Sequence, residues 1–147
     1  MTTIAYRNGT LAGDTLITEG EMKLSERGRK VFKLRDGRLF AASGRVEEGL
    51  MLLDALRNGE PTPKCSGVRA LLVHPNGKLE GYEGKRWSRI FGAEYAALGS
   101  GSPYALGAMA VGASAIQAVR AGMRHGALSG GRVQYVSLKK KRKKSRR

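Results

Sequence analysis

Three short turns of the type that closes β-hairpins divide this chain into paired extended segments. In each turn a glycine follows an asparagine or aspartate, and apolar, β-forming runs lie on both sides. The turns are Asn8-Gly9, Asp36-Gly37 and Asn76-Gly77. Such dipeptides are strong hairpin signals because they tolerate the positive φ angles that tight turns need. The sequence therefore predicts three antiparallel hairpins, with strands over residues 2–7 and 10–13, 30–34 and 38–43, and 68–74 and 78–82.

Three other segments have helical spacing of apolar residues. Val46, Leu50 and Leu53 predict a helix over residues 46–57. Pro103 is expected at the first position of a second helix, which continues to residue 111, and Ser114 is expected to cap a third, over residues 115–123. The order of strands, helix, strands, two helices and strand predicts an α+β domain with helices on the outer faces of antiparallel sheets. Further extended segments are predicted over residues 14–18, 87–91, 96–98 and 133–138.

The composition limits the classes of protein and of site. The chain has 147 residues, 41% of them hydrophobic, which predicts one globular domain over residues 1–138. A single cysteine, Cys65, excludes an intramolecular disulfide and a multi-cysteine zinc site. His74 and His125 are isolated, so we expect no metal centre. No secretion signal and no apolar stretch of membrane-spanning length are present, so we expect a cytoplasmic protein with no membrane contact.

Positive charge is concentrated in the last nine residues. The net charge is +15, and residues 139–147, KKKRKKSRR, hold eight of the 27 basic side chains. The other 138 residues then carry 19 basic and 12 acidic groups, a net charge of +7. We expect Lys139 to Arg147 to be a disordered tail, because like charges repel and cannot form a core. Such a tail predicts weak, salt-dependent contact with polyanions.

The start of the chain has the chemistry of a nucleophile. Met1 precedes a threonine, and an initiator methionine before a small residue is normally removed. Thr2 would then hold a hydroxyl and a free α-amine on one residue. An α-amine has a pKa near 8, so part of it is neutral at pH 7 and accepts a proton. Thr2 is therefore a candidate nucleophile that carries its own general base.

Several further motifs share the order and spacing of one enzyme family. They are Thr2-Thr3-Ile4, Gly13-Asp14, Thr18, Lys30, Gly99-Ser100-Gly101-Ser102-Pro103-Tyr104-Ala105 and Ser129-Gly130-Gly131. In these positions the chain resembles the proteasome β-type N-terminal-nucleophile hydrolases. It is most similar to the peptidase subunit of the bacterial two-component ATP-dependent (HslV-like) protease. The resemblance covers nearly the whole chain and implies a four-layer α-β-β-α sandwich and a threonine endopeptidase that needs no cofactor.

The resemblance also implies roles for five catalytic residues. Thr2 would attack a peptide carbonyl and use its own amine, through a water, as base. Lys30 would depress the pKa of Thr2 as a nearby cation, and Asp14 would hold Lys30 in place. Ser100 would orient the amine or the water, and Ser129 belongs to the same cluster.

The same resemblance implies a substrate cleft. A backbone N–H must stabilise the oxyanion, and counting from Lys30 along its hairpin places that donor at Ala42, with Gly44 close behind. Phe40 and Thr18 would line the cleft, Thr18 through its backbone. Each of these residues alone also fits an ordinary turn or strand position, so their joint order carries the prediction.

The chain departs from the family pattern at three points. Only one helix is evident between residues 44 and 61, where relatives usually have two. Gly126 stands where proteasome β-subunits have an aspartate, three residues before Ser129, so a carboxylate is missing from the cluster. Ala42 replaces the usual glycine at the oxyanion position. The expected fold is thus a reduced version of the sandwich, with one helix missing, and ring stoichiometry cannot be carried over.

The resemblance implies partners as well as chemistry. Polypeptides would be the substrates, an oligomeric ring of identical chains the assembly, and an ATP-driven unfoldase a candidate partner. Two alternatives stay open at this point. One is a proteasome-like scaffold subunit that is catalytically weak or inactive. The other is a basic polyanion-binding or nucleic-acid-binding protein whose working part is the tail.

Overall fold

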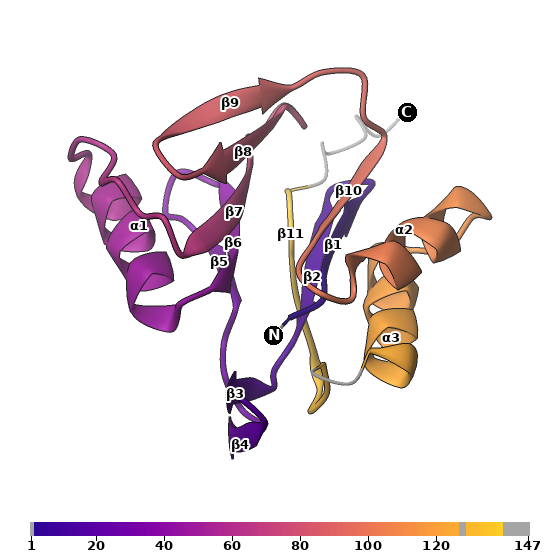
Figure 1. Cartoon of the computed structure of the whole chain (residues 1–147). Coiled ribbons are helices and arrows are strands. Elements are labelled where there is room, and N and C mark those ends of the chain that lie inside the picture. The colour runs from indigo at the N-terminus through magenta and orange to yellow at the C-terminus, as the bar shows by residue number, and fades with distance from the viewer. Residues whose placement is uncertain (1, 127–128, 140–147) are drawn as a thin grey trace, which may run out of the picture.

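The computed structural model describes residues 2–126 and 129–139 (Figure 1). Met1 and residues 140–147 lie outside the described residues, so the predictions of methionine removal and of a disordered tail stay predictions. None of the described helices is long and apolar enough to cross a membrane.

Two antiparallel sheets form the centre of the molecule (Figure 1). The four-stranded sheet has the order β10 (Tyr95–Leu98), β1 (Ile4–Arg7), β2 (Thr10–Asp14) and β11 (Val133–Ser137). The five-stranded sheet has the order β5 (Val31–Lys33), β6 (Leu39–Gly44), β7 (Val68–Val73), β8 (Leu79–Glu83) and β9 (Arg86–Ile90). The three predicted hairpins are present as β1–β2, β5–β6 and β7–β8. At the first turn, Asn8 and Gly9 both have positive φ, 49° and 81°, as their sequence predicts.

The helices cover the outer faces of the two sheets. Helix α1 (Val46–Asn58) packs on the five-stranded sheet, and α2 (Ser102–Ala110) and α3 (Ala115–His125) pack on the four-stranded sheet (Figure 1). The layers therefore follow the order helix, sheet, sheet, helices, which confirms the predicted α-β-β-α sandwich. Within the described residues, α1 is the single helix between β6 and β7, as expected for a reduced version.

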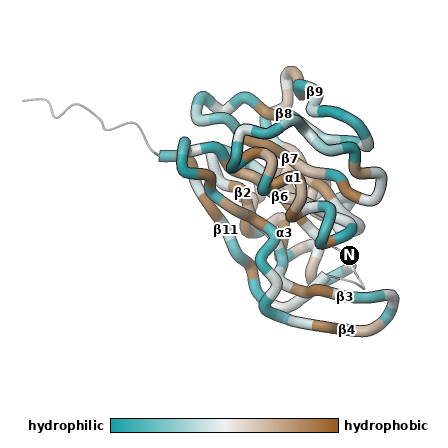
Figure 2. Tube along the Cα trace, turned by 90° about the vertical axis from the view of Figure 1, so that its left-hand side faces the viewer, coloured by the Kyte–Doolittle hydropathy of each residue, from teal (hydrophilic) through white to brown (hydrophobic). Residues whose placement is uncertain are grey.

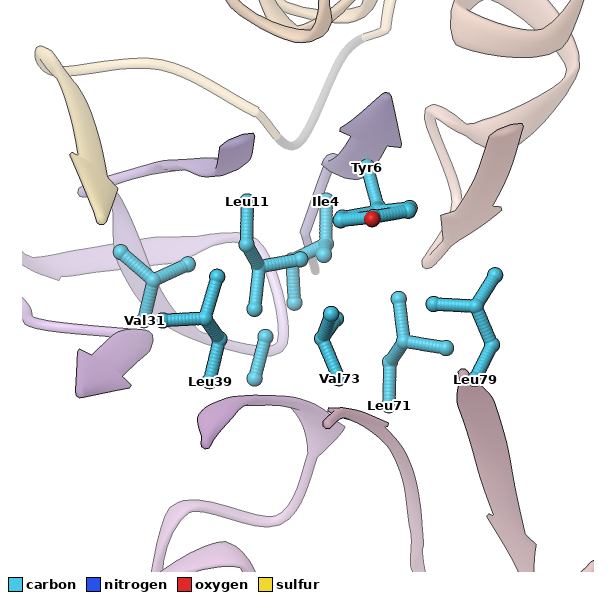
Figure 3. Close-up of a cluster of buried hydrophobic side chains, with 9 residues drawn as sticks. Ile4, Tyr6, Leu11, Val31, Leu39, Leu71, Val73 and Leu79 are labelled. Atoms are coloured by element: carbon cyan, nitrogen blue, oxygen red, sulfur yellow. The ribbon is translucent and has the colours of Figure 1, made fainter. Parts of the chain in front are cut away.

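Three apolar clusters hold the layers together. The cluster between the sheets contains Ile4, Leu11, Val31, Leu71 and further large side chains from both sheets (Figure 3). A second cluster joins α1 to its sheet, and a third joins α2 and α3 to theirs. In Figure 2 the hydrophobic stretches accordingly gather toward the middle of the molecule. The third cluster consists mostly of alanines, so its helices approach their sheet closely.

Three details differ from the sequence-based prediction. Residues 14–18 do not form one extended segment: Asp14 ends β2, and a separate hairpin follows, with β3 (Ile17–Glu19) paired to β4 (Met22–Ser25). All four residues of β4 are exposed, so it lacks the alternating burial that makes a strand recognisable. Pro103 is the second residue of α2, because the helix already begins at Ser102. Strand β9 ends at Ile90, and Phe91 beyond it is 75% exposed.

Candidate active site

The glycine turn after β10 packs directly on Thr2 and Thr3. Both threonines are buried, and the N–H of Gly101 donates a hydrogen bond of 3.2 Å to the Thr2 carbonyl oxygen. A Cβ atom at Gly99 would overlap that carbonyl oxygen, and one at Gly101 would overlap the Thr3 hydroxyl oxygen. Gly99 also has a φ of 89°, which other residues rarely adopt. The two glycines of the Gly-Ser-Gly motif are therefore needed for the turn to reach the start of the chain.

Asp14, the last residue of β2, is the hub of a buried hydrogen-bond network. Its Oδ1 atom accepts bonds of 2.9 Å from Lys30 Nζ and 2.9 Å from the Thr3 N–H. Its Oδ2 atom accepts a bond of 3.1 Å from the Gly130 N–H. The carboxylate has no solvent exposure, so these three donors replace the water that burial removes. Asp14 thus joins the chain start, the entry to β5 and the loop after α3.

Lys30 is the cation of this network. It immediately precedes β5 and is 6% exposed. Burial lowers the pKa of Lys30 below its ordinary value, while attraction to Asp14 and the hydrogen bond between them oppose that shift. Buried ionisable groups with a perturbed pKa and a specific charge partner are found more often at functional sites than elsewhere, so Lys30 is a candidate site residue.

Ser129 meets the second threonine. Thr3 Oγ1 and Ser129 Oγ form a buried hydrogen bond of 2.7 Å. Helix α3 closes over this pair so tightly that a Cβ atom at Gly122 would overlap the Thr3 side chain. Thr3 is thus a further member of the cluster. The resemblance assigns Thr3 no role, although the pair of threonines at the start of the chain is the sequence signal that points to it.

A pocket opens beside Thr2. Six of the nine predicted site residues line it: Thr2, Thr18, Lys30, Phe40, Ala42 and Gly44. Apolar side chains complete its walls, among them Ile17 of β3 and Val46 and Leu50 of α1. A hydroxyl, a cation and an apolar recess therefore share one cavity, which is the composition of a site that orients an organic substrate.

Two backbone N–H groups were candidates for binding the oxyanion. The Ala42 N–H donates to the Lys30 carbonyl oxygen at 3.4 Å, so it already has a partner. The Arg45 N–H donates to Gly67 of the neighbouring segment, and bond directions alternate along a strand. Gly44 is two residues beyond Ala42 in β6 and has no residue of β5 opposite it, so a regular alternation would turn its N–H to the side of the Ala42 N–H. Gly44 has a φ of 114° and abuts the Gly67 carbonyl, so glycine is required there.

Ser100 is separated from the buried network. It is exposed and lines an adjoining groove together with Thr18 and Gly44. Within the described residues, no hydrogen bond of its hydroxyl group is found. The structure thus brings Asp14, Lys30 and Ser129 together in one network and puts Ser100 at its edge.

Thr15 is a further member of the network that the sequence analysis does not single out. It is 2% exposed, and its Oγ1 donates 2.6 Å to the Glu26 carbonyl and accepts 2.7 Å from the Arg132 N–H. Thr15 thereby joins the segment that leads to Lys30 with the segment that follows Ser129. A threonine after the Gly-Asp pair carries no special pattern, so only the tertiary contacts reveal this role.

Metal-ligating side chains do not gather in the part of the chain that the structure describes: no group of three or more His, Cys, Asp or Glu is found there. His74 bonds Glu80 across the β7–β8 hairpin at 2.6 Å, and the His125 ring lies 5.7 Å from the ring of Tyr104. The polar groups of the described site are hydroxyls, the Asp14 carboxylate, the Lys30 ammonium, two arginine guanidinium groups on the pocket wall and backbone amides.

Comparison with known proteins supports the same architecture. No protein-family model matches the chain, and no curated protein matches its sequence. Among solved structures, BPH of Thiobacillus denitrificans in complex with epoxomicin has a TM-score of 0.69 and 23% identity, covering 95% of this chain and 99% of that one. A second structure of Thiobacillus denitrificans BPH has a TM-score of 0.69 and 23% identity, covering 94% of this chain and 98% of that one. Eukaryotic HslV from Trypanosoma brucei gives a TM-score of 0.71 at 15% identity, covering 92% and 97%. The chain therefore has the HslV-like fold that its motifs predicted.

Proposed function

We propose that this chain is a threonine endopeptidase whose nucleophile is Thr2, exposed by removal of Met1. The observation that carries the proposal is the shared pocket of Thr2 and Lys30, with the Lys30 ammonium held at 2.9 Å by Asp14. The HslV-like fold supports the reaction class, because HslV-type proteins are threonine peptidases.

The first half of the reaction forms an acyl-enzyme. The Thr2 oxygen bonds to the carbonyl carbon of the substrate, and its proton passes through a water to the Thr2 amine. The carbonyl oxygen becomes an oxyanion, for which the Gly44 N–H is the proposed donor. When the intermediate collapses, the C–N bond breaks and the leaving amine takes the proton from the Thr2 amine. The second half repeats these steps with water as the nucleophile and releases the product acid and free Thr2.

The buried network supports this chemistry in the proposal. The Lys30 ammonium favours the deprotonated forms of the Thr2 hydroxyl and amine, because like charges repel and an anion is attracted. Asp14 keeps that ammonium in place, and the bond between Thr3 and Ser129 fixes the residue next to the nucleophile. Ser100, exposed at the adjoining groove, is the proposed contact for the attacking water.

The proposal extends to the assembly. An oligomeric ring of this chain would act on polypeptides in the cytoplasm, with an ATP-driven unfoldase as a candidate partner. The single helix between β6 and β7 leaves less surface for packing than two would, so ring size must be measured.

The deciding experiment combines intact-mass analysis with a covalent probe. Epoxomicin is suitable because a protein of similar fold has been solved in complex with it. We expect a mass without Met1, one epoxomicin adduct on Thr2, and cleavage of unstructured peptides by the same preparation.

Two variants make the assignment specific. Thr2→Ala is expected to abolish both the adduct and peptide cleavage. Thr10→Ala removes another threonine hydroxyl, one that bonds Ser137 away from the pocket, and is expected to keep both. Retained Met1 with neither adduct nor cleavage would reject the proposal and favour the inactive scaffold subunit.

A further inference from the structure

Arg29 stands on the wall of the pocket that contains Thr2. Its guanidinium carbon lies 5.1 Å from the ring centroid of Phe32, which lines the same pocket. Its Nε donates a hydrogen bond of 3.0 Å to the Val31 carbonyl oxygen. The ring contact and the hydrogen bond restrict the guanidinium group before any ligand arrives, so less conformational entropy remains to be lost on binding.

The other N–H groups of Arg29 are available to a ligand. Of the five donors of a guanidinium, only Nε has a hydrogen bond within the described residues, and Arg29 makes no ion pair there. The paired N–H groups at the end of the side chain match the two oxygens of a carboxylate.

The charges of the pocket all have one sign. Arg29, Lys30 and Arg45 line it, and no Asp or Glu does. Lys30 is neutralised by Asp14, whereas Arg29 and Arg45 have no carboxylate within ion-pair distance in the described part of the chain. The pocket is thus an apolar recess with uncompensated positive charge, which favours a ligand with an apolar stem and an anionic end.

We propose that the pocket selects substrates with an acidic residue, glutamate above all, immediately before the scissile bond, and that Arg29 is the residue that determines this specificity. The inference rests on the proposed function, because attack by Thr2 places the side chain beside the attacked carbonyl into the adjoining pocket. A glutamate side chain supplies the methylene stem for Phe32 and Leu50 and the carboxylate for Arg29.

The test is a series of four peptides that differ only in the residue before the cleaved bond: Glu, Gln, Leu or Lys. Glutamate and glutamine have the same shape, so their ratio of kcat/KM isolates the charge. We expect kcat/KM about tenfold higher for Glu than for Gln, a difference of about 1.4 kcal/mol, because hydrogen bonds are stronger when both groups are charged. The lysine peptide should be the poorest substrate.

A matched pair of variants assigns the effect to one side chain. Arg29→Met should reduce the Glu-to-Gln ratio of kcat/KM to about one. Arg57→Met is the control, because Arg57 lies 5.8 Å from the same Phe32 ring but does not line the pocket. It should keep the wild-type ratio.

Four results would overturn the inference. A preference of the wild-type protein for Leu over Glu would mean that the apolar wall of the pocket determines the substrate specificity. Loss of the Glu-to-Gln ratio in Arg45→Met, but not in Arg29→Met, would move the role to Arg45. Absence of cleavage for all four peptides, together with absence of an epoxomicin adduct, would reject the proposed function and this inference with it. An adduct or cleavage without Glu preference rejects the inference alone.

Discussion

Thr2 lies between two regions of opposite character. On one side is the support network, which we define as Thr3, Asp14, Thr15, Lys30 and Ser129; all five are 7% exposed or less, and all are hydrogen-bonded. On the other side is the pocket, whose walls are apolar and whose cation Arg29 has most of its donors free.

The contrast between the two regions shows that positioning a nucleophile and binding a substrate side chain need different kinds of surroundings. A nucleophile needs neighbours that do not move, and buried groups with every hydrogen bond made are rigid because any displacement leaves a polar atom unpaired. A binding pocket needs unsatisfied groups, because only those gain a partner when the substrate enters. Changes in the support network should therefore alter stability and activity together, whereas a change of Arg29 on the pocket wall should mainly alter substrate preference.

Among changes in the support network, Asp14→Asn is expected to have the largest effect on stability and activity. The substitution leaves the Lys30 ammonium buried without its counter-charge, so we expect a loss of about 3–5 kcal/mol in the free energy of unfolding and loss of peptide cleavage. Urea denaturation and a peptide assay measure the two losses.

The control for this change is Asp36→Asn. Asp36 pairs with Arg38 at 2.7 Å on the surface, with its side chain 54% exposed, so we expect a loss below about 1 kcal/mol and normal activity. Equal effects of the two substitutions would show that burial does not distinguish the support network.

Thr15→Val is expected to have a smaller effect of the same kind. Valine keeps the shape but cannot bond the Glu26 carbonyl or the Arg132 N–H, so we expect a loss of about 1–3 kcal/mol in the free energy of unfolding. Thr15→Ser keeps the hydroxyl and should restore most of the stability and of kcat. A Thr15→Val protein with unchanged stability and kcat would remove Thr15 from the network.

The pH dependence of stability tests the charge of Lys30. Because its pKa is lowered in the folded protein, the unfolded chain binds more protons between that folded pKa and the ordinary value of 10.5. The free energy of unfolding should therefore rise with pH across this window. Lys30→Met should lack the rise, which denaturation at several alkaline pH values would measure.

The Cys65 thiol also contributes to the pH dependence of stability, with the opposite sign. Its contribution cancels when the wild-type protein and Lys30→Met are compared. Burial, with the nearby charge of Glu48, raises the pKa of the Cys65 thiol above 9.0, so its contribution to stability falls as pH rises past the unfolded value. Both proteins contain Cys65, so only the difference between their pH curves reports on Lys30. A difference that does not grow with pH would contradict the assignment.

Deletion of residues 139–147 is expected to have the smallest effect on either region. No residue of the support network or of the pocket lies in that segment, so peptide cleavage and stability should stay within experimental error. Salt-sensitive binding to heparin should be lost, because eight basic side chains are removed. Loss of cleavage together with heparin binding would favour a protein whose function depends on its basic tail.

Local patterns were sufficient for most of the architecture. The hairpin turns, the capping serine before α3 and the helical spacing of α1 depend on residues a few positions apart, and all are present. Strand β4 was missed because its side chains are all exposed and leave no alternating pattern. The family motifs also pointed to Thr2, Asp14 and Lys30, because the order and spacing of motifs can be read from the sequence without the structure.

The sequence alone determined the hairpins, the three helices and the residue types available for chemistry, because turn preference and apolar spacing depend on residues that are close together in the chain. Tertiary structure alone decided which distant groups meet: Ser129 with Thr3, Thr15 with two other segments, and Arg29 with Thr2 in one pocket. The Thr3–Ser129 and Thr15–Arg132 contacts join residues 126 and 117 positions apart, and spacing along a chain does not specify which distant groups the fold will bring within hydrogen-bond distance.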